Sequence, residues 1–190
     1  MPTEFDVIQR YFSGITDTRE DVEVGIGDDC ALLRVPKNAG LAVSIDTLVE
    51  GIHFSPGTDP QSLGHKSLAV GLSDLAAAGA SPCWATLALT LPDVNESWLD
   101  AFSRGFASLA QASGVQLVGG DTTRGPLSIT VQVHGQLHDH AMLLRSGAAA
   151  GDLVYATGTL GDAALGLLVR GDARIRNDAE TLFMALDRPQ

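Results

Sequence analysis

Aspartates that lie beside small residues recur along the chain, and their carboxylates suit the binding of divalent cations. Asp28 and Asp29 follow Gly27 and precede Cys30, which predicts a tight turn that presents two adjacent acids. Two carboxylates in an apolar neighbourhood repel each other unless a positive charge neutralises them, and Arg34 is the only basic residue nearby. An Asx turn, in which an aspartate bonds its own backbone, is the alternative. We favour a metal site.

Asp46 follows the apolar run 41–45, so we expect it at the carboxyl end of a buried strand, where ligands are commonly bound. Ser44 lies two positions earlier and faces the same side of that strand. A hydroxyl and a carboxylate would then lie side by side, as hard cations prefer. A solvated strand end explains Asp46 equally well when this residue is taken alone.

Asp74 lies late in a predicted helix over 60–80 and is followed by small residues. A carboxylate there opposes the helix dipole, and Ala78 occupies the i+4 position of a possible basic partner. The small residues allow another backbone to come close. A purely structural role must explain an unpaired charge on a packed helix, so we favour a functional one.

Gly120 and Asp121 belong to the segment GGDTTRG, residues 119–125, after a predicted strand over 115–118. Glycines permit close approach to a phosphate, and hydroxyls and Arg124 can hydrogen-bond it. An ordinary hairpin loop is the alternative, because Gly-Asp pairs are common in turns. The segment supports a phosphate-binding role only when it is considered together with the other acidic residues.

Two further residues have an open interpretation. Arg145 is a sparse positive charge that either clamps a nucleotide phosphate or forms a surface salt bridge. His53 either contacts a substrate or is a half-buried structural histidine.

The overall charge narrows the class of partner. With 12 basic and 23 acidic residues among 190, the net charge is −11, which argues against nonspecific nucleic-acid binding. Metal ions can still bridge an acidic protein to a phosphorylated ligand. There is no GxxxxGK[ST] segment, so this is not a P-loop protein. The HRD and DFG elements of protein kinases are missing too, and no GxSxG segment occurs.

The cysteines and the apolar runs indicate the cellular compartment. Cys30 and Cys83 have no CxxC partner, so we expect buried thiols in a reducing compartment. The N-terminus is acidic where a signal peptide would be basic, and no apolar run approaches the roughly 20 residues of a membrane span. We expect a cytoplasmic protein with no membrane partner.

Hydrophobic periodicity predicts the elements that must position these residues, and their mixed order indicates an α+β fold. A Gly/Ala-rich stretch at 147–151 predicts a domain boundary, with domains over 1–146 and 147–190. The second would begin with a strand over 152–157 and a helix over 162–169. In the first domain we expect helices over 4–12, 60–80 and 95–113, and strands over 31–35, 41–45, 83–91, 115–118 and 127–137.

Five segments together resemble the thiamine-monophosphate kinases, a family in the superfamily of aminoimidazole ribonucleotide synthetase and selenophosphate synthetase. They are GIGDDCALL, SIDTLVEGIHF, LSDLAAAGASP, LALTLPDV and LVGGDTTRGPLSITVQVHG. The resemblance covers essentially the whole chain, in order. It implies a mixed sheet with helices on one face, a homodimer built by the N-terminal domain, and the start of a second α/β domain.

The resemblance also implies an ATP-dependent phosphotransferase that converts thiamine monophosphate to thiamine diphosphate by direct in-line transfer. Several Mg²⁺ ions would assist, and no residue would carry the phosphoryl group. The family's later Asp-x-Ser-Asp-Gly segment does not occur here, so we expect an N-terminal portion of the kinase. By resemblance, the metal ligands are Asp29, Ser44, the backbone of Ile45, Asp46, Asp74 and Asp121; Gly120, Asp121 and Arg145 contact ATP; and His53 contacts the thiamine substrate.

Two alternatives remain beside this function. The first is another ATP-using enzyme of the same superfamily that acts on a different substrate. The second is a non-catalytic, dimerising module that binds Mg-nucleotide.

Overall fold

The structure, a computed structural model, describes residues 3–138, 142–156, 158–170 and 179–189. The chain forms two compact units, Met1–Met142 and Leu143–Gln190. The second unit holds η1 (Arg145–Gly147), α4 (Asp162–Val169) and α5 (Glu180–Asp187). The first unit holds α1 (Glu4–Tyr11), β1 (Val22–Val24), β2 (Leu32–Leu33), β3 (Ala39–Val49), α2 (Pro60–Ala78), β4 (Ser81–Leu91), α3 (Glu96–Ala112), β5 (Gln116–Arg124) and β6 (Ser128–His138).

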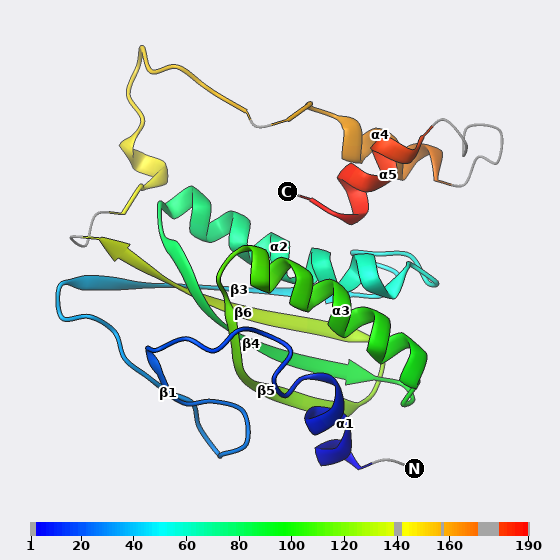
Figure 1. The fold of residues 1–190 in the computed structure, drawn as a ribbon. Coiled ribbons are helices and arrows are strands. Elements are labelled where there is room, and N and C mark those ends of the chain that lie inside the picture. The colour runs from blue at the N-terminus through cyan, green and yellow to red at the C-terminus, as the bar shows by residue number, and fades with distance from the viewer. Residues whose placement is uncertain (1–2, 139–141, 157, 171–178, 190) are drawn as a thin grey trace. The chain divides into compact units, whose positions relative to one another are not determined.

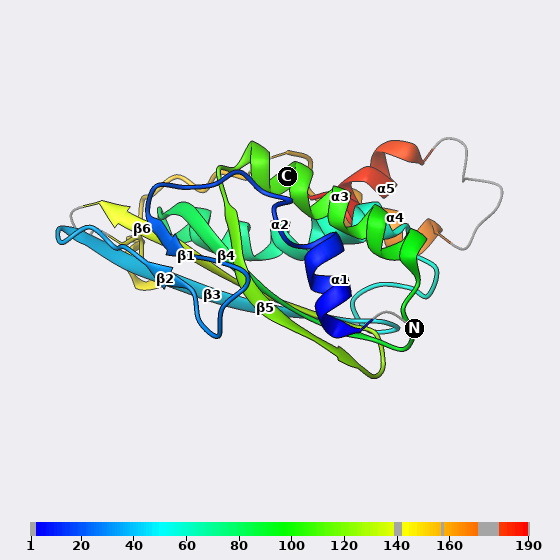
Figure 2. The ribbon, with the colours of Figure 1, turned by 60° about the horizontal axis from the view of Figure 1, so that its bottom comes forward.

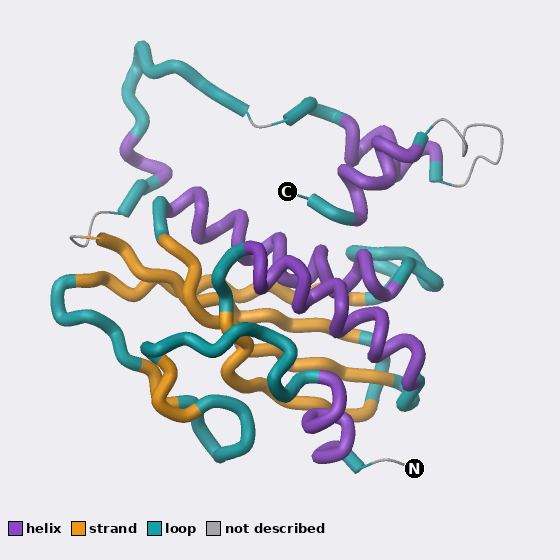
Figure 3. The backbone as a smooth tube through the Cα atoms, in the orientation of Figure 1, coloured by secondary structure: helices purple, strands orange, loops and turns teal. Residues whose placement is uncertain are grey.

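A four-stranded sheet in the order β3-β6-β4-β5 forms the frame of the first unit (Figures 1 and 3). β6 pairs antiparallel with both β3 and β4, whereas β4 and β5 are parallel and are connected through α3. Antiparallel and parallel pairs in one sheet make it mixed. The predicted α+β fold with a mixed sheet is therefore confirmed.

The two long helices, α2 and α3, lie together on one face of this sheet (Figure 2). Alternate residues of the strands point toward them, so Leu87 and Leu89 of β4 are buried in the core with Phe102 and Phe106 of α3. The predicted placement of helices on one face is confirmed. The other face is left open along much of β3 and β6.

Local signals set the ends of these helices. The Asp59 side chain accepts a hydrogen bond from the Ser62 N–H, Pro60 lies in the first turn, and Gly79 ends α2 in the left-handed conformation. Asn95 caps α3 by accepting from the Trp98 N–H. Such signals are readable without tertiary context, and both helices begin and end close to their predicted limits.

The helices α2 and α3 approach each other closely at two glycines. A Cβ on Gly64 would overlap the carbonyl oxygen of Phe102, and a Cβ on Gly105 would overlap that of Gln61. Backbone atoms cannot move aside as a flexible side chain can. Glycine is therefore required at both crossing points, and this close packing holds the helical layer on the sheet.

A small ribbon of β1 and β2 covers one end of the opposite face. Trp84 of β4 is buried there against residues of the ribbon, including Val22 and Leu33. The Trp84 indole N–H donates to Asp21 at 3.0 Å, and Arg19 forms an ion pair with the same carboxylate at 2.8 Å. These hydrogen bonds hold the pKa of Asp21 below its usual range, with the Arg19 bond as the larger cause.

Several strand limits differ from the prediction. β3 runs to Val49 and pairs with β6 along its whole length, so Asp46 lies within the strand and not at its carboxyl end. The predicted strand over 31–35 shrinks to β2, and its partner β1 was not predicted. The predicted strand over 41–45 ends where the apolar run meets the charged Asp46. Backbone pairing of β3 continues beyond that residue, because β6 is available as a partner strand.

The second unit contains the predicted helix α4, which packs against α5. A Cβ on Gly166 would meet the carbonyl oxygen of Leu182 at 2.6 Å, so glycine allows this contact. The strand predicted over 152–157 is wrong for residues 152–156, and Thr157 lies outside the described residues. The apolar side chains of 153–155 are strongly exposed.

Among the residues that the structure describes, no helix is both long and apolar enough to cross a membrane.

Replacing either crossing glycine should destabilise the fold. Gly64→Ala and Gly105→Ala should each lower the free energy of unfolding by about 1–3 kcal/mol, the usual cost of overpacking. The better helix propensity of alanine offsets at most ~1 kcal/mol of this. Urea denaturation measures the change. Gly25→Ala is the control, because its Cβ would meet only side-chain atoms at 3.7 Å; equal stability of all three variants would contradict the crossing argument.

Acid should remove the contribution of Asp21. A carboxyl group whose folded pKa is depressed stabilises the protein above its unfolded pKa of about 3.9, and this contribution is lost as the pH falls through the folded pKa. Asp21→Asn should therefore lower stability at pH 7, and its difference from the parent should shrink below about pH 4. Urea denaturation at several pH values measures this. The exposed Asp17→Asn serves as control, and a difference that is independent of pH would refute the assignment.

Candidate metal and nucleotide site

A cleft of about 520 Å³ lies along β5 and brings the two glycine-flanked acidic segments together. The turn over 26–31, with Asp28 and Asp29, forms part of its lining, and residues 117–122 of β5 form another part. Three apolar side chains of the N-terminal segment, Phe5, Ile8 and Phe12, complete it with Thr86 and Leu87. We call it the GDD–GGD cleft.

The GDD turn presents its acids to solvent. Asp28 Oδ1 accepts a hydrogen bond from the Asp29 N–H at 2.8 Å, and Gly27 has a positive φ of 124° that favours glycine. This bond reaches the next residue and not the one two positions on, so it does not make an Asx turn, and it uses only one carboxylate oxygen. The Asp29 carboxylate has no hydrogen bond or ion pair with the described part of the chain, so it is available to a ligand.

The GGD segment is part of an edge strand, so the strand predicted over 115–118 continues further than expected and the hairpin-loop alternative is wrong. β5 continues through residues 119–124, parallel to β4, with Gly120 beside Leu87 and Asp121 beside Ala88. A Cβ on Gly120 would overlap the Leu87 carbonyl oxygen, and its φ is 156°. Glycine is needed because the two strands approach closely there. Asp121 is the next residue of β5, and its exposed side chain lines the cleft.

A second acidic group lies between β3 and α2. Ser44 Oγ donates to Asp74 Oδ2 at 2.6 Å, so the Asp74 side chain is not unpaired as expected. Asp46 follows Ser44 by two residues and is half-buried on the same face of β3. The side chain of Ile45 points to the open face and is 59% exposed, so only its backbone carbonyl is available to a cation.

The two acidic groups lie at opposite edges of the sheet. Asp46 pairs with Val131, Val131 with Leu87, and Leu87 with Gly120, so one row of residues crosses all four strands. Three strand spacings separate the edges by roughly 14 Å. Two ligands of one Mg²⁺ ion lie at most about 4 Å apart, because each Mg–O bond is about 2.1 Å. Within one chain, Asp46 of β3 and Asp121 of β5 therefore cannot share an ion.

The chemistry of the donors nevertheless fits Mg²⁺, since all of them are oxygens. Within the described ranges, no group of three or more His, Cys, Asp or Glu side chains could hold a metal by itself. Mg²⁺ commonly takes only one or two carboxylates from a protein and completes its shell with water and substrate phosphates. Asp29 with Asp121, and Asp46 with Asp74, would each supply such a partial set.

His53 and Arg145 lie elsewhere. His53 Nδ1 accepts from the Val49 N–H at 3.0 Å, which fixes the ring in the turn after β3 and leaves Nε2 for another partner. Its neighbours Glu50 and Phe54 line a separate cavity of about 410 Å³. Arg145 is an exposed residue at the start of η1 in the second unit.

Sequence reasoning missed the apolar part of the cleft. The apolar spacing predicts only a helix over 4–12. Phe5 is 80% exposed and lines the cleft, which could have been recognised only once the partner segments were known. Cys30 is exposed and lines the cleft, so its expected burial is wrong. Cys83 is buried as expected, and this burial raises the pKa of its thiol.

The chain is similar to several known proteins in sequence and in structure. The chain is 57% identical over 166 residues to the thiamine-monophosphate kinase of Salmonella typhimurium, covering 87% of this chain and 51% of that protein. The crystal structure of thiamine-monophosphate kinase from Stenotrophomonas maltophilia K279a is 46% identical with a TM-score of 0.83, covering 90% of this chain and 57% of that one. A structure of AaThiL complexed with AMPPCP and TMP is 30% identical with a TM-score of 0.74, covering 83% and 52%.

The chain spans about half the length of the curated relatives that it matches. Residues 27–137, more than half of the chain, match the family described as AIR synthase related protein, N-terminal domain. This range holds the GDD turn, the Ser44–Asp74 pair and the GGD strand. The chain therefore belongs to the AIR synthase related protein family, whose N-terminal domain it contains.

Proposed function

We propose that this chain provides the N-terminal part of a thiamine-monophosphate kinase, which transfers the γ-phosphoryl group of ATP to thiamine monophosphate. One observation carries the proposal: the GDD turn and the GGD strand line one cleft in a chain 57% identical to such a kinase. The AaThiL complex with AMPPCP, an analogue of ATP, and TMP supports both substrates.

The residues suit the positioning of two anions. Phosphoryl transfer depends mainly on alignment and charge neutralisation, with little covalent work for the protein. In our proposal Asp29 and Asp121 hold the cation that faces the phosphates, and Gly120 allows a phosphate to approach the backbone. Bound Mg²⁺ would neutralise the facing phosphates and hold them in line. Phe5, Ile8 and Phe12 would exclude water from this side of the cleft.

The remaining site residues keep the roles that the resemblance implies. Asp46 and Asp74, with Ser44 and the carbonyl of Ile45, would hold further Mg²⁺ ions. Arg145 would contact ATP and His53 the thiamine substrate. Transfer would be direct, without a phospho-enzyme.

We further propose a homodimer through the open face of the sheet. Leu41, Val43 and Ile45 of β3 point there and are 48%, 53% and 59% exposed. β3 is also an edge strand, which can pair with a second chain. Contiguous apolar side chains on one face favour burial against a partner. A second copy offers the same apolar surface.

A dimer would also complete the site. Because Asp46 and Asp121 lie at opposite edges of one sheet, a partner whose β3 lies near β5 would bring its Asp46 to the GDD–GGD cleft. Each dimer would then contain two composite sites.

The function is tested by thiamine diphosphate formation from ATP, Mg²⁺ and thiamine monophosphate, resolved by chromatography. We expect product above a blank without enzyme, its loss in Asp121→Asn because the cation loses a charged ligand, and its retention in Asp17→Asn, an exposed aspartate outside the cleft. Absence of both product and Mg²⁺-dependent nucleotide binding would reject the proposal. Nucleotide binding without product would favour the non-catalytic module.

Mixed dimers test the shared site. Asp46→Asn and Asp121→Asn chains, each with a different affinity tag, are co-expressed, and the heterodimer is isolated by two affinity steps. If sites are shared, one site per heterodimer contains both native aspartates and the other contains neither. Calorimetry with Mg-AMPPCP should then show half the parent stoichiometry at near-parent affinity, whereas each variant homodimer binds at least about tenfold weaker, as expected for the loss of one charged ligand.

Two outcomes contradict this arrangement. A heterodimer that binds no better than the variant homodimers places each site within one chain. A chain that remains monomeric at all concentrations refutes the homodimer itself.

A further inference from the structure

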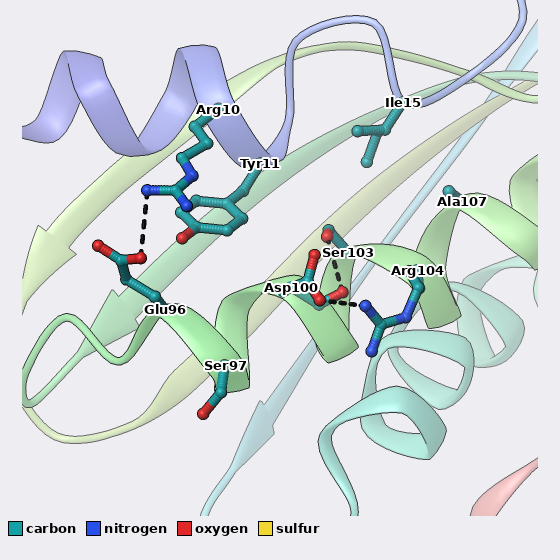
Figure 4. Close-up of a pocket in the computed structure, with 9 residues that line it drawn as sticks. All are labelled: Arg10, Tyr11, Ile15, Glu96, Ser97, Asp100, Ser103, Arg104 and Ala107. Atoms are coloured by element: carbon teal, nitrogen blue, oxygen red, sulfur yellow. Dashed lines mark hydrogen bonds and ion pairs between the residues drawn. The ribbon is translucent and has the colours of Figure 1, made fainter.

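A second cleft, of about 680 Å³, lies between α1 and α3 in the first unit (Figure 4). None of the residues that the sequence points to as metal, nucleotide or substrate ligands lines it. We call it the α1–α3 cleft. Its lining consists of Arg10, Tyr11, Ile15, Glu96, Ser97, Asp100, Ser103, Arg104 and Ala107.

The hydroxyl of Tyr11 is the feature that points to a ligand. Tyr11 is only 6% exposed, and its buried hydroxyl has no hydrogen-bond partner among the described residues. A buried tyrosine hydroxyl normally finds a partner. Figure 4 shows the ring below the Arg10 guanidinium, with the hydroxyl toward the side of the cleft that holds Glu96. The wall of the cleft therefore holds an unsatisfied donor, which an acceptor on a ligand would satisfy when the neighbouring Arg10–Glu96 pair exchanges partners.

Charges of both signs surround this hydroxyl. Arg10 and Glu96 form an ion pair at 3.2 Å between α1 and α3, and Arg104 forms an ion pair with Asp100 along α3. All four side chains are more than half exposed, so these pairs are weak and can exchange partners with a ligand. Two guanidinium groups and two carboxylates match a ligand with one positive and one negative group. A simple anion would meet both carboxylates and a chain of net charge −11.

The helix α1 takes part in both clefts. Its residues Phe5 and Ile8 line the GDD–GGD cleft, whereas Arg10 and Tyr11 line the α1–α3 cleft. A ligand that fixes α1 against α3 therefore acts on a wall of the cleft that we assign to nucleotide. Coupling of this kind is reciprocal, because each ligand changes the affinity for the other by the same factor.

We propose that the α1–α3 cleft is a regulatory site for a small dipolar ligand, which accepts a hydrogen bond from Tyr11 and pairs with the charges of both arginines and both carboxylates. The identity of that ligand rests on the proposed function. Thiamine phosphates carry a cationic thiazolium ring and an anionic phosphate, so substrate and product belong to this class. Thiamine diphosphate, the product, would bind here and change the affinity for Mg-nucleotide through α1.

Fluorine NMR with 3-fluorotyrosine tests the site directly. The chain has two tyrosines, and Tyr155 is 85% exposed, so its signal is an internal control, assigned with Tyr155→Phe. Titration with thiamine diphosphate, without Mg²⁺ and nucleotide, should shift the Tyr11 signal saturably and leave that of Tyr155 in place. Thiamine alone and inorganic phosphate alone, each with half of the charge pattern, should bind at least tenfold more weakly.

Matched arginine variants locate the binding. Arg104→Gln should weaken the Tyr11 titration at least tenfold. Arg34→Gln removes an exposed, ion-paired arginine outside the cleft and should leave it unchanged. Addition of thiamine diphosphate should change the Kd for Mg-AMPPCP at least threefold in the parent and not in Arg104→Gln.

Three results would overturn the proposal: a Tyr11 signal that does not move with thiamine diphosphate, inorganic phosphate binding as tightly as thiamine diphosphate, or equal weakening by both arginine variants. The readout at Tyr11 needs no turnover. A shifting Tyr11 signal in a protein that forms no product would therefore remove the kinase function and keep the dipolar site.

Discussion

The close approach of β5 to β4 at Gly120 is the constraint on which the candidate site depends. A side chain there would overlap the Leu87 carbonyl oxygen, so the strand pair exists only with glycine at this position. Because the pair holds, Asp121 projects from an edge strand that borders the cleft and not from a mobile loop. The GDD turn and α1 then complete a cleft around a backbone that a phosphate can approach without meeting a side chain.

The same sheet keeps apart the aspartates that the family resemblance assigns to one metal site. Four strands with β3 at one edge and β5 at the other leave two partial ligand sets about three strand spacings apart. Each set has too few carboxylates to hold by itself the Mg²⁺ ions that, in our proposal, neutralise the phosphates. The open face, with its exposed apolar residues on β3, supplies the reason for a second chain to bind and to join the sets. A single surface would then account for both assembly and catalysis.

The sequence predicts those features that depend on neighbouring residues alone, such as the ends of helices. Asp59, Pro60 and Gly79 mark the ends of α2 without any tertiary context, and both long helices are close to their predicted limits. It does not predict where β3 and β5 end, because their charged and glycine residues are held in the sheet by β6 and β4. The pairing of Asp29 with Asp121 in one cleft is equally nonlocal. The acids could be identified from their settings, but their division between two edges could not.

The helix α1 shows how a short amphipathic segment can serve more than burial. Val7 and Tyr11 are buried, yet Phe5 is exposed in one cleft and Arg10 borders the other. A helix of eight residues is marginal without tertiary contacts, so its position depends on what packs against it. A bound ligand on either side adds such contacts. The two clefts therefore share α1 as a wall, and this shared wall is the physical basis that we propose for coupling between them.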